Sequence, residues 1–164
     1  MENKSNIPES SKDYLTQSNE IKLHEILNKL NIEHKATTIK NEEDIENLEG
    51  SFPNTILAKN PEDIFYLIIK NKANDVKLGT LAKWINDTDL TVVTSETNTI
   101  SFPLDRITLF AIMDIKDVVV LIDSTLKEND KINFYSMTNN KIITITTTDM
   151  INYINNFDHK VIFY

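Results

Sequence analysis

The chain has 164 residues, of which 40% are hydrophobic and 26% charged, so its length and composition fit one soluble globular domain. It contains no cysteine, which excludes a disulfide framework, a thiolate nucleophile and a cysteine zinc site. A net charge of −8 argues against broad nucleic-acid binding, because phosphate neutralisation needs clustered lysine and arginine. No apolar run approaches the roughly 20 residues that span a bilayer, and the polar start lacks a signal-peptide core. We therefore expect a cytoplasmic protein that makes no membrane contact.

The first segment is predicted to be a disordered leader. Residues 1–19 are rich in Ser, Asn, Lys and Glu and show no apolar periodicity. Order is expected from Glu20 onward, because four apolar residues then recur at helical spacing: Leu23, Ile26, Leu27 and Leu30. A chain truncated to begin near Glu20 should accordingly melt at about the same temperature as the full chain.

Strand and helix patterns then alternate through the middle of the chain. Gly50 and Pro53 interrupt them, and a turn at 60–63 separates two apolar runs as in a hairpin. In order, the predicted elements are a strand at 34–40, an acidic helix at 42–48, hairpin strands at 54–59 and 64–70, a helix at 76–85 and a strand at 90–94.

The last third of the chain is predicted to complete the sheet. Its elements are a second hairpin with strands at 107–113 and 118–122, strands at 132–134 and 142–146, a helix at 149–155 and a closing strand at 161–164. Hairpins and helices mix without βαβ regularity. The prediction is an α+β domain over 20–164, with a mixed, mostly antiparallel sheet flanked by helices.

Taken residue by residue, the chain shows no catalytic constellation. Two glycines cannot build a dinucleotide fingerprint or a P-loop. His24, His34 and His159 are not at metal-ligand spacing, so we predict neither a metal site nor a cofactor. A basic run is formed by Lys70, Lys72, Lys77 and Lys83. A solvated face is its plainer interpretation, and a local contact with a phosphate is the alternative.

A series of short stretches carries a family resemblance over residues 21–164. Residues 50–59 resemble the pattern G-x-H-x-K-N-L-F-L-K, and the others are an aromatic-rich strand at 65–69, D-L-K-x-L-A-K at 75–83, V-T-P-F-G-L at 107–112, V-V-L-D at 119–123, F-H-P-M-T-N at 134–139 and G-H-x-P at 158–161. Their order and spacing resemble those of the YbaK/ProX family of aminoacyl-tRNA editing domains.

The resemblance implies a hydrolase that removes a wrong amino acid from the 3′ end of a tRNA, most often alanine from the proline-specific tRNA. A small pocket excludes the cognate amino acid. The tRNA's own terminal hydroxyl and a bound water take part, so neither a protein nucleophile nor a cofactor is needed. The implied partners are the tRNA acceptor end and a prolyl-tRNA synthetase, in cis or in trans.

The same resemblance assigns site residues. Catalytic roles fall on Asn54, Tyr135 and His159, and substrate contacts on Thr55, Thr108, Thr138 and Asn139. With a tRNA substrate, the basic run of Lys70, Lys72, Lys77 and Lys83 supplies the expected tRNA contacts. Six of these residues are expected to converge on one concave pocket: Asn54, Thr55, Tyr135, Thr138, Asn139 and His159. The chain departs from the family pattern where Asn54 replaces its lysine and Tyr135 its histidine.

Two hypotheses follow from these departures. In the first, the chain is a deacylase with a rewired pocket, which the Thr138-Asn139 turn and His159 favour. In the second, it is a catalytically weak or inactive module appended to a prolyl-tRNA synthetase and used for tRNA or protein docking. The loss of a lysine at Asn54 favours the second, because a neutral amide holds an anion more weakly than an ammonium does.

Overall fold

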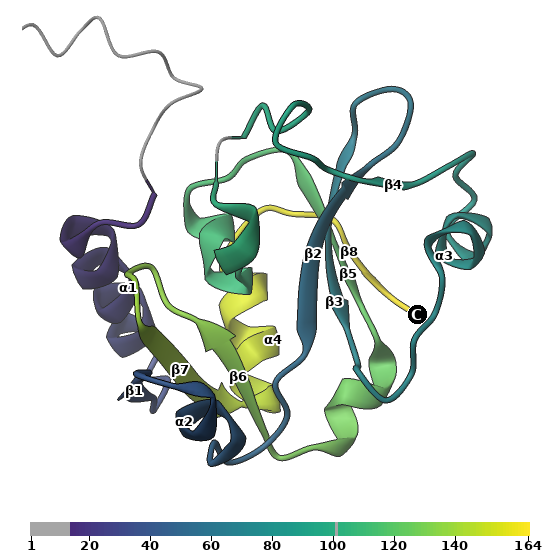
Figure 1. Ribbon diagram of the computed structural model, residues 1–164. Helices are drawn as coiled ribbons and strands as arrows, with labels where there is room; N and C mark the ends of the chain where they lie inside the picture. Colours follow the sequence, from purple (N-terminus) through teal and green to yellow (C-terminus); the bar gives the residue numbers. More distant parts are fainter. Residues whose placement is uncertain (1–13, 101) are drawn as a thin grey trace, which may run out of the picture.

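The computed structural model describes residues 14–100 and 102–164 (Figure 1). Four α-helices lie within this part: α1 (Gln17–Lys29), α2 (Glu42–Glu46), α3 (Leu78–Trp84) and α4 (Thr147–Asn155). One sheet has the strand order β1 (Lys35–Thr38), β7 (Lys141–Thr146), β6 (Lys131–Tyr135). The other has the order β4 (Thr91–Val92), β2 (Asn54–Lys59), β3 (Phe65–Lys70), β5 (Val118–Ile122), β8 (Val161–Phe163). Three 3₁₀ helices are η3 (Leu104–Arg106), η4 (Leu109–Met113) and η5 (Ser124–Glu128).

The strand pairing confirms the predicted α+β class. The pairs β1–β7, β6–β7, β2–β3 and β2–β4 are antiparallel, whereas β3–β5 and β5–β8 are parallel. The strands form two sheets instead of the single one expected. A lone parallel bridge between Ser51 and Ile132 connects them.

The second predicted hairpin is wrong. Residues Leu109–Met113 form η4, and β5 pairs in parallel with β3. The Thr108 side chain starts this helix by accepting a hydrogen bond from the Phe110 N–H. Because η4 is buried on nearly every side, its sequence lacks the polar alternation that separates a strand from a buried helix.

The predicted leader also ends too late. Residues 1–13 lie outside the described part, but α1 already begins at Gln17. The Thr16 side chain caps it by accepting a hydrogen bond from the Asn19 N–H at 3.0 Å. Tyr14 is buried, with its ring centroid 5.4 Å from that of Phe102. The part from Tyr14 to Asn19 therefore belongs to the folded domain.

The main core lies between the two sheets. It joins the inner faces of both sheets with α1, α4 and η4, and the Tyr153 hydroxyl of α4 donates to the Phe110 carbonyl at 2.9 Å inside it. A smaller cluster packs between α3 and the outer face of the five-stranded sheet. Figure 1 shows α1 and α3 on opposite sides of the molecule. Within the described residues, no helix is long and apolar enough to cross a membrane.

Candidate functional site

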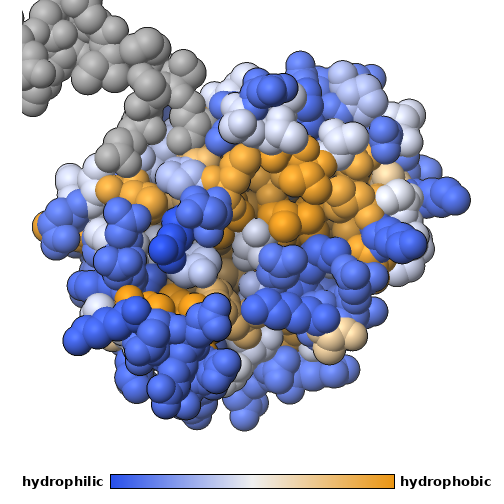
Figure 2. Space-filling view, in the orientation of Figure 1, coloured by the Kyte–Doolittle hydropathy of each residue, from blue (hydrophilic) through white to orange (hydrophobic). Residues whose placement is uncertain are grey.

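A cavity of about 310 Å³ lies where the two sheets diverge. Beyond the Ser51–Ile132 bridge, β2 and β6 separate, and the cavity is lined from both strands and from η3. Its lining includes Phe52, Asn54, Thr55, Lys72, Asp105 and Tyr135, and we name it the wedge cavity. Figure 2 shows hydrophobic residues exposed between η3 and β2, bordered by hydrophilic ones. The apolar side chains that line the wedge cavity include Ile56, Leu104 and Ile107.

The loop that leads into β2 is held by a buried amide. The Asn133 side chain is fully buried and donates to the carbonyl oxygens of Glu49 at 2.8 Å and Ser51 at 3.0 Å. Its own oxygen accepts from the Thr144 hydroxyl. Every polar atom of this buried side chain is thus paired, and β6 fixes the path of the loop towards Asn54.

The start of β2 presents an open backbone edge to the wedge cavity. Strand β4 pairs only with Ala58 and Lys59, so among the described residues no strand pairs with the first half of β2 on that side. The Leu57 carbonyl points to this side, where it accepts from the Val93 N–H at 2.9 Å. Because backbone groups alternate in direction along a strand, Thr55 directs its N–H and C=O to the same edge.

Thr108 lies behind Tyr135 and outside the cavity lining. It is fully buried, and its hydroxyl donates to the Tyr135 carbonyl. The same oxygen accepts from the Phe110 N–H at 3.3 Å. Thr108 therefore ties the end of β6 to η4 and sets the position of Tyr135, which differs from the substrate contact predicted for it.

Two cations and two aromatic rings form a continuous row that runs from the wedge cavity to a neighbouring cavity lined by Arg106. The centroids of Phe52 and Tyr135 are 5.3 Å apart in an edge-to-face arrangement. The Lys72 ammonium lies 4.8 Å from the Phe52 centroid, and the Arg106 guanidinium carbon lies 4.9 Å from that of Tyr135. Sequence reasoning missed Phe52 and Arg106. The available signal was that Arg106 is the only arginine in the chain.

Three of the six residues expected to converge do not line the wedge cavity, so the expected convergence is wrong for them. The hydroxyl of Thr138 lies 3.3 Å from that of Ser136, and Asn139 is exposed in the β6–β7 turn. His159 lies between α4 and β8, where its ring nitrogens are 3.0 and 3.1 Å from the carbonyl oxygens of Val118 and Ile112. Asn54, Thr55 and Tyr135 do meet at the cavity.

The predicted basic run is divided in space. Lys72 alone among its four members lines the wedge cavity. The Lys70 ammonium is largely buried and lies 2.9 Å from Asp75, whose pKa it lowers through this hydrogen bond and its charge. Lys77 precedes α3 and Lys83 lies in its last turn, over the outer face of the five-stranded sheet.

A second polar cluster, missed at the sequence level, joins α1 to the start of β1. Glu20 is buried; it accepts from the Met137 N–H at 3.0 Å and lies 2.9 Å from the His24 ring. The other nitrogen of His24 is 2.8 Å from His34. The four-residue spacing of Glu20 and His24 on a helix could have predicted their contact, but nothing in the sequence indicated that His34 would join them. Among the described residues, no group of three or more His, Asp or Glu side chains is placed to hold a metal ion.

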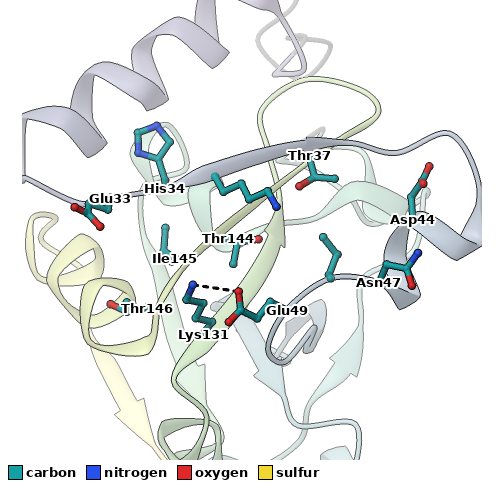
Figure 3. A pocket seen from close by; sticks show the side chains of 12 residues that line it. Glu33, His34, Thr37, Asp44, Asn47, Glu49, Lys131, Thr144, Ile145 and Thr146 are labelled. Carbon is teal, nitrogen blue, oxygen red and sulfur yellow. Dashed lines mark hydrogen bonds and ion pairs between the residues drawn. The ribbon is translucent and has the colours of Figure 1, made fainter.

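A larger cavity, of about 600 Å³, lies on the outer face of the three-stranded sheet (Figure 3). Threonines of β1 and β7 line it, and the Lys131–Glu49 ion pair, 3.2 Å long, lies along it. None of the predicted site residues is part of this lining. The motifs that carry the family resemblance therefore point to the smaller wedge cavity.

Comparison with known proteins agrees with the motifs. The chain's overall fold resembles that of a candidate trans-editing enzyme for prolyl tRNA synthetase, with 12% identity, coverage of 90% of this chain and 96% of that chain, and a TM-score of 0.66. The fold also resembles that of a hypothetical protein, APE2540, with 8% identity, coverage of 86% of this chain and 97% of that chain, and a TM-score of 0.68. At such identities the likeness concerns the fold alone. No curated protein matches the chain. Residues 32–153, well over half of the sequence, match the family model described as the aminoacyl-tRNA editing domain, and the chain belongs to that family.

Proposed function

We propose that this domain hydrolyses the ester of a mischarged tRNA, with alanine on the proline-specific tRNA as the substrate. Membership of the editing family supports aminoacyl-tRNA editing in general. The open edge of β2, facing Tyr135 across the wedge cavity, is the observation that carries the proposal for this chain. The cavity of about 310 Å³ is large enough for an aminoacyl ester, and the choice of alanine rests on the family resemblance.

The chemistry that suits this cavity is water attack on the ester carbonyl. The carbonyl oxygen gains negative charge as the tetrahedral intermediate forms, and fixed N–H donors stabilise it. Thr55 offers a backbone N–H at the open edge, and the Asn54 amide and Tyr135 hydroxyl are further donors. The intermediate then loses the tRNA's terminal oxygen, which takes up a proton, and the amino acid leaves with the oxygen of the water.

Two observations favour a second function. The family's lysine is replaced by Asn54, and the net charge of −8 weakens attraction to tRNA. A catalytically weak module that docks tRNA or a prolyl-tRNA synthetase fits these two facts. The two functions differ in whether the intact chain releases the amino acid.

The test is a deacylation assay with alanyl-tRNA and prolyl-tRNA of the proline-specific tRNA, at low ionic strength, with and without the synthetase. We expect release of alanine only. Asn54→Ala and Tyr135→Phe should slow it, whereas Asn139→Ala, at an exposed position outside the cavity, should not. If Asn139→Ala slowed release and Asn54→Ala did not, the wedge cavity would not be the site.

A further inference from the structure

We infer that Lys72, Phe52, Tyr135 and Arg106 form a docking row for the terminal nucleotides of the tRNA, with the cations on phosphates and the rings against bases. This inference rests on the proposed function and adds the residues that hold the nucleic acid beside the ester. Arg106 and Phe52 are positioning residues in this account, because they lie next to the reacting bond without acting on it.

The geometry of the row is that of a single continuous surface. Its members come from four separate segments: the loop before β2, the loop after β3, the end of β6 and η3. From Lys72 through the two ring centroids to Arg106, the successive distances are 4.8, 5.3 and 4.9 Å. Distant parts of the chain thus bring two cations and two rings together: Lys72, Phe52 and Tyr135 line the wedge cavity, and Arg106 lines a neighbouring cavity that shares Asp105 and Tyr135 with it.

Both cations lack a carboxylate partner within the described residues. The ion pairs there that involve lysine use Lys22, Lys59, Lys70 and Lys131. Lys72 is exposed and Arg106 half-buried, and each lies over an aromatic ring. A ring face holds a cation without neutralising it, so both charges remain available to an external anion.

Charge and aromatic surface together indicate the class of ligand. Proteins that hold single-stranded nucleic acid combine cations along the backbone with rings on which bases stack. Asp105 is the acidic residue of the same lining, and its charge matches the α-ammonium group of an aminoacyl ester. Because the whole chain carries a net charge of −8, attraction to tRNA must come from such a local cationic site.

The experiment measures binding of uncharged proline-specific tRNA to the full chain over a series of salt concentrations. Lys72→Ala and Arg106→Ala should each weaken binding several-fold and reduce the salt slope by about 0.7, the value for one phosphate contact on a single strand. Lys116→Ala is the matched control, because it removes an exposed cation that lies outside the cavity and has no predicted role in tRNA binding. Equal affinities and slopes for all three variants and the wild type would overturn the inference.

Deacylation measured on the same variants separates the two proposals. If the wild type releases alanine and the Lys72 and Arg106 variants bind and react like it, the docking row is wrong and the editing function stands. If both cations prove necessary for tRNA binding, but neither the wild type nor any variant releases alanine, the docking row is supported and the editing function is wrong. Circular dichroism of each variant verifies that the fold is intact.

Discussion

At the scale of single residues, Gly50 controls the loop that enters the wedge cavity. Its φ is +88°, and a Cβ atom there would lie 2.4 Å from the Lys131 carbonyl oxygen. Gly50→Ala should therefore lower the free energy of unfolding by at least about 1–3 kcal/mol, through backbone strain and the clash. Urea denaturation measures this loss.

Gly79 provides the control for that substitution. A Cβ atom at Gly79 meets nothing within 4 Å, and the residue lies within α3. Gly79→Ala should raise the free energy of unfolding by about 0.5–1 kcal/mol, because alanine is the better helix former. If Gly50→Ala were as stable as Gly79→Ala, the loop would not need its left-handed conformation.

Tyr66 and Asp87 predict a pH-dependent contribution to stability. The Tyr66 hydroxyl donates to Asp87 at 2.6 Å, and this bond is the main cause that lowers the pKa of Asp87. Burial raises the pKa of Tyr66 to about 12, and Asp87 adds to the shift. The pair thus stabilises the fold above the ordinary pKa of aspartate and below that of tyrosine, and loses this effect as Asp87 gains a proton or Tyr66 loses one.

Tyr66→Phe should cost about 1 kcal/mol near pH 7, since one partner of the bond is at the surface. The difference from the wild type should shrink below about pH 4 and above about pH 10, as followed by denaturation across pH. Tyr135→Phe is the control, because no described residue hydrogen-bonds to its hydroxyl and its cost should not depend on acid pH. A Tyr66→Phe cost that stayed constant down to pH 2 would contradict this interpretation.

The residues that meet at the cavity could be predicted only in part. Asn54, Thr55 and Tyr135 were found through motif positions, and they meet because the start of β2 and the end of β6 border the same cavity. Thr108 and His159 are also polar residues at motif positions, but their side chains hydrogen-bond to main-chain carbonyl oxygens within the fold. A sequence shows which residues are polar and leaves open which of them the fold has already paired.

At the scale of elements, the start of α1 belongs to the folded domain, and this reverses the truncation prediction. Removing residues 1–19 deletes the Thr16 cap and the buried Tyr14 ring. A lost cap costs about 0.5–2 kcal/mol and a lost buried aromatic ring about 3–5 kcal/mol. The truncated chain should therefore melt several degrees below the full chain.

Point variants check this without shortening the chain. Tyr14→Ala should lower the melting temperature, whereas Ile21→Ala, at a half-exposed position of α1, should change it little. Equal melting temperatures for the full chain and the truncated one would show that the packing of Tyr14 on Phe102 adds nothing.

Elements with a clear period were the predictable ones. The β2–β3 hairpin and α4 lie close to their expected positions, because a turn separates the two strands and a threonine caps the helix, and the apolar spacing of α1 was found although its start was placed three residues too late. The helical state of η4 and the parallel pairing of β5 with β3 were missed. The sequences of η4 and β5 are apolar throughout, and such runs do not indicate the direction or the partner of an element.

At the scale of the whole molecule, an acidic domain has to act on an acidic substrate. With a net charge of −8, long-range repulsion works against tRNA, and screening by salt also weakens the few local attractions. Activity is therefore expected to be highest at low ionic strength and to fall as salt rises. A rate that rose steadily with salt would show that the cations of the docking row contribute nothing to tRNA binding.

The most direct test of the editing proposal is to restore a positive charge at the cavity with Asn54→Lys and measure release of alanine from alanyl-tRNA. Asn54 pairs with Lys70 across the ladder, but Lys70 is already neutralised by Asp75, so a second cation meets little repulsion. A charge-assisted contact is worth about 1.5–3 kcal/mol, so we predict a rate increase of roughly ten- to a hundredfold. Asn139→Lys adds the same charge outside the cavity and should leave the rate unchanged. If neither the wild type nor Asn54→Lys releases alanine at low ionic strength while both remain folded, the editing proposal is contradicted and a docking module is the better account.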